Sequence, residues 1–403
     1  MSEGDLRIDW AAGRMPVLAE IRRQFAAERP LTGQRVAVCI HLEAKTAVLA
    51  LALAEAGAEV TVCGSNPLST QDLVAAALAG RGVSVFARRG IDAKTYQDFL
   101  DRSLERQPTL LLDDGGDLVA RALASGRHTT VLGGTEETTT GVARLVQLAG
   151  RGRLPFPMVA VNDGAMKHLF DNRFGTGQSA LEAVMRATNI SIAGCRLVVV
   201  GFGDCGRGVA ERGRGLGAQV AVVEVDAVRA NLAYFDGFSV LSMDQAAAWG
   251  ELFITVTGNR QVIRGRHLDR MRDGAVLANA GHFDVEVDKP ALHRRAERVE
   301  EVRPHVQAFR LKSGRSLYLL AEGRLVNLVA ADGHPIEIMD LSFSLQALSL
   351  AFLATHRLPG GVHRVPPELD RRVAELSLGA RGISLERLTP AQRRYLDPDG
   401  SRP

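Results

Sequence analysis

The sequence predicts an α/β fold with two doubly wound domains and a C-terminal segment that returns to the first of them. Apolar runs of strand length alternate with helical segments up to about residue 160, as in parallel sheets whose strands are buried on both faces. A second such block contains a glycine-rich turn between two strands, which is typical of Rossmann domains. The 403 residues also exceed what one ordinary core holds.

The first domain is expected to begin with a helix and to continue as alternating strands and helices. Apolar residues at helical spacing (Met15, Leu18, Ile21 and Phe25) predict a helix between residues 11 and 30, which Pro30 ends. The expected strands are RVAVCI (35–40), AEVTVCG (58–64), VSVFARRG (83–90) and TLLLDDGGD (109–117). Ligands bind beyond the carboxyl ends of such strands, where His41 and residues 65–72, 113–117 and 135–140 follow.

The stretch from residue 196 to residue 226 predicts a dinucleotide site. The apolar strand at 197–200 leads into Gly201, Gly203 and Gly206, at the spacing that lets a backbone approach a pyrophosphate. The helix that follows directs its first N–H groups and its positive dipole end at those phosphates. The alternative is an ordinary strand–helix turn without a ligand.

The acid at the end of the next strand favours NAD over NADP. The strand Val220–Val223 ends on Glu224, where a carboxylate accepts hydrogen bonds from the ribose and would repel a 2′-phosphate. Arg229, five residues later, is the one residue that argues in the other direction.

The second α/β block extends to about residue 332, and the chain then returns. Its later strands, LFITVTG and GAVLANAGHFD, contain Gly258 and Gly281, which would let a flat cofactor lie over the strand ends. The apolar segment after Gly333 predicts a long helix that packs on the first domain. The expected divisions are 1–178, 179–334, a return helix at 335–365, and a charged tail at 366–403 on the surface or on a partner subunit. Two crossings, near 175–179 and 333–338, would form a hinge pair.

Composition and charge exclude several classes of partner. The 49 basic and 46 acidic residues are spread along the chain and leave a net charge of +3, so no nucleic-acid or polybasic membrane partner is expected. No apolar stretch reaches the ~18 residues of a membrane span and no targeting pattern is visible, so we expect a cytoplasmic protein. The four cysteines lack C-x-x-C spacing, which predicts neither a zinc site nor a disulfide framework.

Eight separated segments resemble those of one enzyme family. They are HLEAKTA, NPLSTQD, LDDGGDL, EETTTGV, VNDGAMKHLFDN, GFGDCGRG, NAGHFDVE, and LLAEGRLVNL followed by GHP. In this order they resemble the S-adenosylhomocysteine hydrolase family over nearly the whole chain. The resemblance implies a substrate-binding domain followed by a Rossmann domain with tightly held NAD, and a homotetramer.

The resemblance also implies the reaction, which is reversible hydrolysis of S-adenosyl-L-homocysteine to adenosine and L-homocysteine. In that family the ribose 3′-hydroxyl is transiently oxidised by NAD, which makes the 4′ proton acidic. Homocysteine is then eliminated at the 5′ carbon, water adds, and the hydride returns, so there is no net redox change.

Six residues match the positions that carry this chemistry: His41, Asp114, Glu137, Lys167, Asp171 and His282. A lysine with a lowered pKa could take the 3′-hydroxyl proton, and Asp171 lies on the same helical face as Lys167. The alternative for this pair is an exposed ion pair. Glu137 would hold the ribose hydroxyls, or else cap a helix.

The remaining three residues are expected near the 4′ and 5′ positions. Asp114 would move the 4′ proton, at a pKa raised by burial, and its alternatives are an Asp-Gly turn or a magnesium cluster; no metal is expected. His41 and His282 would meet across the closed cleft between the domains and pass a proton to the leaving sulfur. Their alternative is a structural role at two strand ends.

The expected NAD contacts come from both domains. They are Thr138, Thr139, Thr140, Asn172, Gly201, Gly203, Asp204, Cys205, Gly206, Glu224, Asn259, Asn279, Gly281, Asn327 and His334.

The nucleobase end departs from the familiar pattern. The expected substrate contacts are Glu43, Lys45, Thr46, Asp332, Gly333 and His334. Lys45 stands where familiar members have a glutamate that accepts from the adenine amino group, and Glu43 stands where they have threonine. A lysine only donates, which suits the carbonyl of hypoxanthine. S-inosyl-L-homocysteine or a specialised nucleoside is therefore an alternative substrate, unless a self-neutralised Glu43–Lys45 pair admits adenine.

Two further functions stay open from the sequence. One is a catalytically silent NAD-binding relative, and the other is a simple NAD-dependent dehydrogenase with net redox output.

Overall fold

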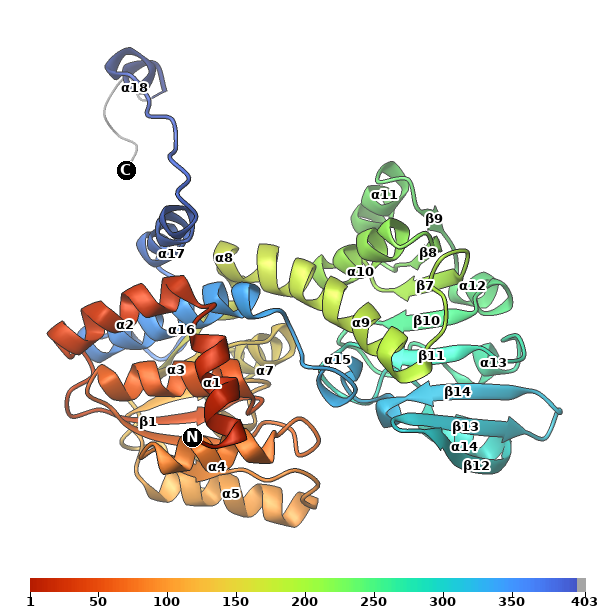
Figure 1. Ribbon diagram of the computed structural model, residues 1–403, viewed down its shortest axis with the longest axis horizontal. Coiled ribbons are helices and arrows are strands. Elements are labelled where there is room, and N and C mark those ends of the chain that lie inside the picture. The colour runs from red at the N-terminus through yellow and green to blue at the C-terminus, as the bar shows by residue number, and fades with distance from the viewer. Residues whose placement is uncertain (397–403) are drawn as a thin grey trace.

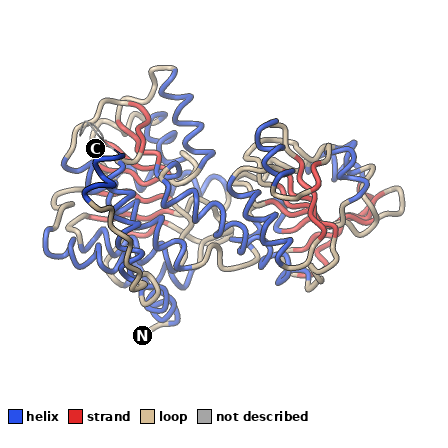
Figure 2. The backbone as a smooth tube through the Cα atoms, turned by 90° about the horizontal axis from the view of Figure 1, so that it is seen from above, coloured by secondary structure: helices blue, strands red, loops and turns tan. Residues whose placement is uncertain are grey.

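Two lobes, each built on its own sheet, make up the protein (Figure 1), and the computed structural model describes residues 1–396. The first sheet has seven strands in the order β15-β6-β5-β4-β1-β2-β3, and the second has eight in the order β12-β13-β14-β11-β10-β7-β8-β9. Helices lie on both sides of the strands in each lobe (Figure 2). The predicted α/β class is confirmed.

The first sheet is parallel throughout. Its strands are β1 (Arg35–Cys39), β2 (Glu59–Cys63), β3 (Ser84–Phe86), β4 (Leu110–Asp113), β5 (Gly133–Glu136), β6 (Pro157–Ala160) and β15 (Gly361–Arg364). Since parallel strands end at one edge of a sheet, His41, Asp114 and Glu137 all lie at the edge formed by the ends of β1, β4 and β5.

The helices of the first lobe connect these strands. They are α1 (Glu3–Ala12), α2 (Pro16–Glu28), α3 (Ala44–Glu55), α4 (Asp72–Gly80), α5 (Ala93–Glu105), α6 (Asp117–Ala124), α7 (Thr139–Gly150), η1 (Val161–Asp163) and α8 (Ala165–Lys167). The predicted helix before Pro30 is α2, whose buried face includes Leu18, Ile21 and Phe25. Helix α1 has no counterpart among the predicted elements.

The second sheet has Rossmann topology. Strands β7 (Arg196–Val200), β8 (Gln219–Val223), β9 (Ser239–Val240), β10 (Leu252–Thr255), β11 (Val276–Asn279) and β14 (Ser316–Leu320) are parallel. Numbered along the chain, they lie in the order 3-2-1-4-5-6, which is that of dinucleotide-binding sheets. An antiparallel extension, β13 (Val306–Leu311) and β12 (Ala296–Arg303), continues from β14.

The helical segments of the second lobe complete the doubly wound pattern. They are α10 (Asp204–Gly215), α11 (Ala227–Phe235), α12 (Met243–Trp249), α13 (Gly265–Leu268), α14 (Lys289–Arg295), η3 (Ala321–Gly323) and α15 (Val326–Val329).

Two segments connect the lobes (Figure 1). The first is the π-helical segment η2 (His168–Gly175) with α9 (Thr176–Thr188), and the second is the chain between α15 and α16 (Ile336–Thr355). Helix α16 packs against α2, α3 and α8 and belongs to the core of the first lobe. The expectation that no apolar stretch reaches the length of a membrane span is wrong, because this helix has that length and hydropathy, but 72% of its apolar 18-residue window is buried inside the protein. Its Asp340 carboxylate accepts from the N–H groups of Val17 and Leu18, which begin α2.

The first part of the tail, which the sequence places on the surface or on a partner subunit, packs on the outside of the first lobe. Helix α17 (Pro367–Ala380) packs on α2 and α16, and its Val373 is fully buried. Asp370 of this helix accepts from the N–H groups of Ala165 and Met166, at the start of α8. Helix α18 (Pro390–Leu396) projects away from the body (Figure 1). Residues 397–403 lie outside the described part of the chain.

Candidate active site

The Lys167 ammonium lies in a buried cluster of polar side chains between the lobes. Its Nζ is 3.2 Å from Asp171 Oδ2 and 3.5 Å from Glu137 Oε1, and it donates to Asn172 Oδ1 at 2.8 Å. The Lys167 and Asp171 side chains are 6% and 2% exposed, so the exposed ion pair is excluded. Lys167 ends α8 and Asp171 lies in the π-helical segment that follows, a geometry frequent at functional sites.

The charges of this cluster correct one expectation. Burial opposes a charged ammonium, but the Asp171 and Glu137 carboxylates outweigh it and raise the pKa of Lys167. The predicted lowering of that pKa is wrong for the protein without ligand. Burial raises the pKa of Glu137 to about 8, although Lys167 opposes the rise. Glu137 also accepts from the Gln346 amide on α16, and its Oε1 has no hydrogen-bond partner among the described residues.

The raised pKa of Glu137 predicts a pH dependence of stability. Because the folded protein binds this proton more tightly than the unfolded chain, the stabilisation is fully present below pH 4.5. It is lost as pH rises through about 8. Glu137→Gln should therefore flatten the decline in the free energy of unfolding between these two values, as measured by urea unfolding of the ligand-free protein. An unchanged slope in the variant would contradict the assignment.

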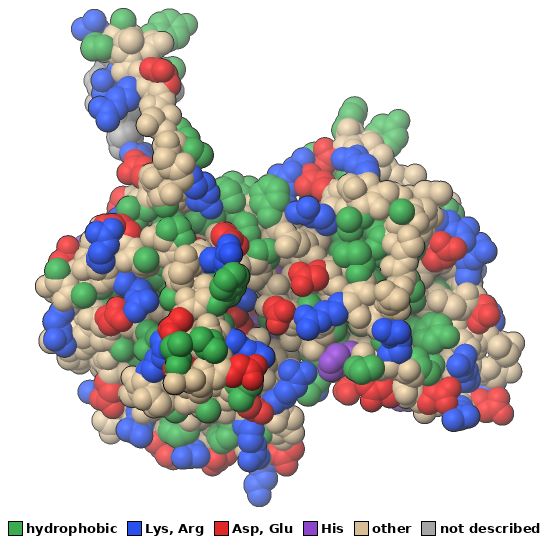
Figure 3. Space-filling view, viewed as in Figure 1, with side chains coloured by type: hydrophobic (Ala, Val, Ile, Leu, Met, Phe, Trp, Pro, Cys, Tyr) green, Lys and Arg blue, Asp and Glu red, His purple; other side chains and the backbone are tan. Residues whose placement is uncertain are grey.

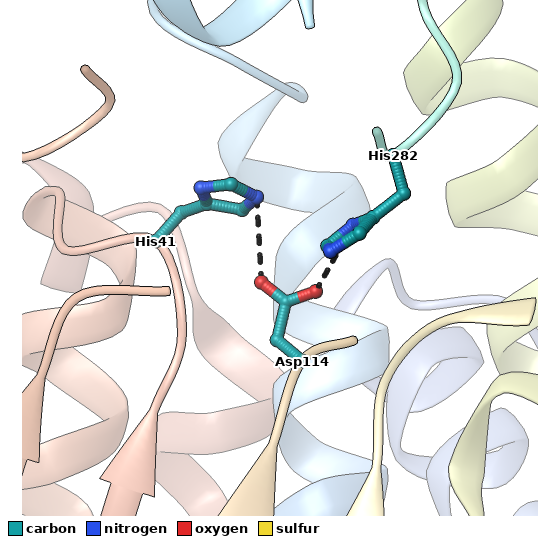
Figure 4. Close-up of side chains that lie close together, drawn as sticks. All are labelled: His41, Asp114 and His282. Atoms are coloured by element: carbon teal, nitrogen blue, oxygen red, sulfur yellow. Dashed lines mark ion pairs between the residues drawn. The ribbon is translucent and has the colours of Figure 1, made fainter. Parts of the chain in front are cut away.

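A second cluster joins His41, Asp114 and His282 (Figure 4). His41 Nε2 lies 3.4 Å from Asp114 Oδ2, and His282 Nδ1 lies 3.8 Å from Asp114 Oδ1. His41 follows β1, Asp114 follows β4, and His282 follows β11 of the other lobe. The structure thus brings the two histidines together across the lobes, on either side of one carboxylate. Gly115 makes this approach possible, because a Cβ there would lie 2.3 Å from His282 Nε2.

His41 is held as a neutral ring. Burial lowers its pKa to about 4, although Asp114 opposes the shift. Its Nδ1 lies 2.6 Å from the Ser69 hydroxyl, and Ser65 donates to Asp114 at 3.0 Å. Both serines belong to the segment at 65–72 that the sequence places at this edge of the sheet.

Glu136 is a buried residue of the site that sequence reasoning missed. Its Oε1 accepts from the N–H groups of Gly115 and Thr138 and from the Thr138 hydroxyl. It therefore ties the loop that carries Asp114 to the loop that precedes α7. The neighbouring Glu137 carries the family match, and successive strand residues point to opposite faces, so only the folded structure separates their roles.

The glycine-rich turn forms a cradle that side chains would fill. Gly201 has φ +105°, and a Cβ on Gly206 would lie 1.9 Å from the Gly201 carbonyl oxygen. Gly203 is the N-cap of α10 and supplies no side-chain cap, so the first N–H groups of the helix stay available to an anion. Glu224 accepts from the N–H groups of Phe202 and Val225. These features fit a dinucleotide pyrophosphate.

Gly206→Ala should disrupt this cradle. The added methyl group overlaps the Gly201 carbonyl, and such overpacking costs about 1–3 kcal/mol, so we expect a lower free energy of unfolding and weaker NAD binding. Gly215→Ala is the matched control on the same helix, since nothing lies within 4 Å of its Cβ position, and it should stabilise by up to about 1 kcal/mol. Equal effects of the two substitutions in denaturant unfolding would contradict the prediction.

Asn279, one of the expected cofactor contacts, makes several hydrogen bonds within its own lobe at the end of β11. Asn279 is fully buried, and its amide donates to the carbonyl oxygens of Gly281, Phe283 and Gly323. Its Oδ1 accepts from Gly281 N–H. These contacts use both amide hydrogens, so Asn279 shapes the loop that carries His282, and its contact with NAD stays a prediction.

Glu286 is a further residue missed from the sequence. Its carboxylate accepts from the Thr257 N–H and hydroxyl and from the Gly258 N–H. A Cβ on Gly281 would lie 1.9 Å from Glu286 Oε1, and a Cβ on Gly258 would lie 3.4 Å from the Thr140 hydroxyl of the first lobe. Both glycines follow the ends of their strands, and Gly258 also lies close to the first lobe. Asn259 is exposed beside them.

The other expected cofactor residues lie around the two clusters. Thr138 caps α7, Thr139 donates to Asn162, and Asn172 also donates to Asn162. Asp204 lies 3.2 Å from His168 Nδ1, Thr176 donates to Cys205 Sγ at 3.6 Å, and Asn327 donates to Ser179. Asn327 Oδ1 has no partner among the described residues. Burial raises the pKa of the Cys205 thiol to about 11.

His334 links the return segment to the Lys167 cluster. Its Nδ1 contacts Asp171 Oδ1, and its Nε2 lies 3.3 Å from the Thr176 hydroxyl. It follows Gly333, whose φ is +74°. Both crossings between the lobes therefore meet at this histidine.

The expected base contacts include a buried, self-neutralised pair. Lys45 Nζ lies 2.9 Å from Glu43 Oε2 and donates to the Asp332 carbonyl oxygen at 3.0 Å. Thr46 donates to the His41 carbonyl oxygen. The Asp332 carboxylate turns away, is 75% exposed, and pairs with Arg186. The expectation that Asp332 brings a polar side chain to the base is therefore wrong, because its backbone faces Lys45 instead.

Family models and curated relatives all match this chain to hydrolases of S-adenosyl- or S-inosyl-L-homocysteine. The family described as S-adenosyl-L-homocysteine hydrolase matches residues 2–130, and its NAD binding domain matches residues 172–333. The chain is 54% identical over 399 residues to S-inosyl-L-homocysteine hydrolase of Methanopyrus kandleri, with 96% of this chain and 93% of that one covered. It is 51% identical to adenosylhomocysteinase of Pyrococcus abyssi, with 98% and 94% covered. It is also 51% identical to adenosylhomocysteinase of Aquifex aeolicus, with 98% and 96% covered.

Proposed function

Because the chain belongs to the S-adenosyl-L-homocysteine hydrolase family, we propose that it reversibly hydrolyses S-adenosyl-L-homocysteine to adenosine and L-homocysteine. The single observation that carries the proposal is the pair of buried clusters, one around Lys167 in the first lobe and one around Asp114, which His282 joins from the second lobe. We assign the substrate to residues 1–178 with the return helix at 335–365, and the cofactor to residues 179–334.

The Lys167 cluster is suited to the ribose hydroxyls. Bound NAD supplies the hydride acceptor for the 3′ carbon. Lys167 lies within electrostatic reach of Cys205 in the glycine-rich turn, since its ammonium lowers the pKa of that thiol against the effect of burial. A charged Lys167 stabilises negative charge on the 3′ oxygen, while Glu137, with its pKa of about 8, is the group able to exchange a proton near neutral pH.

The second cluster is suited to the proton transfers at the 4′ and 5′ carbons. Asp114 contacts both histidines, so a proton taken from the 4′ carbon can reach either ring. Because burial lowers the pKa of His41, a proton that reaches its ring is readily passed on to sulfur or to water. The side chains of His41, Asp114 and His282 are 13%, 3% and 13% exposed, which limits the access of bulk water to the transfers.

The test is release of free thiol from S-adenosyl-L-homocysteine by the purified protein. We expect homocysteine and adenosine in equal amounts, without accumulation of NADH. Accumulation of NADH would instead support a simple dehydrogenase. NAD binding without thiol release would support a silent relative.

A second substrate, S-inosyl-L-homocysteine, is favoured by one specific observation. Lys45 is 6% exposed and presents only N–H donors, which match the hypoxanthine carbonyl and not the adenine amino group. Its contact with Glu43 supports the opposite reading, a neutral pair that admits adenine.

Lys45→Gln should separate the two substrates. If Lys45 donates to hypoxanthine, the variant should lower the kcat/KM ratio of inosyl over adenosyl substrate by about tenfold or more, because a buried group loses its partner. Lys94→Gln, at an exposed position on α5, is the matched control. An unchanged ratio would assign Lys45 to the Glu43 pair alone.

We also propose a homotetramer in the cytoplasm. Apolar side chains on and beside α11 support self-association, since Val225, Val228 and Phe235 are 100%, 78% and 82% exposed. Light scattering of the purified protein measures the subunit number.

A further inference from the structure

A cavity of about 380 Å³ opens where the two lobes meet, outside the two clusters described above. Arg89 lines it from the first lobe, and Arg186, Arg303 and His305 line it from the second, while Asp332 is the one carboxylate among its described lining residues. Basic side chains and a histidine are visible along the boundary between the lobes (Figure 3). The pocket is therefore a cationic site to which both lobes contribute.

The guanidinium groups of this pocket are held in place and keep unused donors. Arg303 Nε donates to the Ala187 carbonyl oxygen at 2.9 Å, and Arg186 Nη1 donates to Asp332 Oδ2 at 3.1 Å. A guanidinium carries five N–H donors, so each of these contacts occupies one of five. Arg89 is exposed and reaches the pocket from the opposite lobe.

The charges of the pocket are not balanced by its own residues. Three arginines and one aspartate leave an excess of two positive charges (3 − 1 = 2). Two further acidic residues, Glu301 and Glu322, line an adjoining cavity of about 210 Å³ that shares Arg89 and His305. Like charges gathered in one concave site raise the local potential and attract an anion.

We propose that this pocket binds a polyphosphate anion between Arg89 of the first lobe and Arg186 and Arg303 of the second. Guanidinium groups match phosphate oxygens in a bidentate fashion, and a cavity of about 380 Å³ accommodates more than one phosphoryl group. An anion that contacts both lobes stabilises the arrangement in which the lobes lie together. It also competes with Asp332 for Arg186, beside the carbonyl that accepts from Lys45.

The experiment is calorimetric titration of the full-length protein with pyrophosphate and, separately, with inorganic phosphate. It is performed at about 10 mM ionic strength, where charges act over about 30 Å. Pyrophosphate should bind more tightly than phosphate, because it carries more charge and more phosphoryl oxygens for the arginines of both lobes. Arg89→Ala and Arg303→Ala should each weaken pyrophosphate binding about tenfold, and Arg89→Lys should weaken it less than Arg89→Ala.

The matched control is Arg212→Ala, which removes an exposed arginine of α10 outside the pocket and should leave the affinity unchanged. Unchanged binding by Arg89→Ala and Arg303→Ala would overturn the proposal. So would equal weakening by Arg212→Ala, or equal affinities for phosphate and pyrophosphate. Because binding is measured without substrate, the result is independent of the proposed hydrolysis.

Discussion

Lys167→Met should lower kcat for thiol release by about 10²–10⁴-fold and should leave the bound nicotinamide oxidised when substrate is added. The Lys167 ammonium lies between the Asp171 and Glu137 carboxylates, at 3.2 and 3.5 Å. Without it, no positive charge of this cluster faces the 3′ oxygen as negative charge develops there. The measurements are thiol release and the absorbance of reduced nicotinamide.

The same substitution should also destabilise the protein. Removing one partner of a buried ion pair costs about 3–5 kcal/mol, because the remaining carboxylates keep their burial and lose their counter-charge. Arg7→Met is the matched control, since Arg7 and Glu3 form an exposed i,i+4 pair with 46% and 61% exposed side chains. Such pairs contribute about 0.3–0.5 kcal/mol.

Lys167→Arg distinguishes loss of charge from loss of fold. This variant keeps the positive charge, so it should unfold close to the wild-type urea concentration while its altered geometry still lowers kcat. A Lys167→Met protein that is folded, stable and fully active would contradict the proposed role.

The elements that could be predicted are those whose apolar sequence pattern matches the burial of their residues in the structure. Strands β1 and β4 contain contiguous apolar runs, and the residues after them lie at one edge of the sheet because parallel strands share a direction. The glycine-rich turn is equally readable, since a Cβ on Gly206 would overlap a carbonyl. His41 and Asp114 directly follow the ends of β1 and β4, so their positions at this edge of the sheet could be predicted.

The parts that could not be predicted depend on contacts between distant residues. Strand β15 is four residues long and carries no apolar run, so only its pairing with β6 defines it. Asp370, in a charged tail, caps the start of α8 about two hundred residues earlier in the chain, as its bonds to Ala165 and Met166 show. The sequence near α8 contains no pattern that predicts this capping contact.

The protonation of Lys167 also depends on contacts between residues that are far apart in the sequence. Four-residue spacing indicates its contact with Asp171, but the rise of its pKa against the effect of burial depends on Asp171 and also on Glu137, which reaches it from another loop. Asn279 likewise matches a cofactor position in sequence, yet three carbonyl oxygens of its own lobe use its amide. A residue type at the right place does not reveal how many of its donors remain free.

His41→Asn and His282→Asn should each lower thiol release by about 10²–10⁴-fold, and the double variant should lose little more than either single one. Both rings contact the same Asp114 carboxylate, at 3.4 and 3.8 Å, so removal of one already breaks the path of the proton. Residues that act as one unit give non-additive losses. His363→Asn on β15, in the first lobe, is the control and should retain full activity.

These histidine variants should differ from Lys167→Met in one observable. Oxidation at the 3′ carbon relies on the Lys167 cluster, which the substitutions leave intact, so substrate should still reduce the bound nicotinamide while thiol release stalls. The double-mutant cycle and the nicotinamide absorbance therefore test separate steps. Losses that multiply in the double variant would show that His41 and His282 act independently, and absent nicotinamide reduction would place them in the oxidation step.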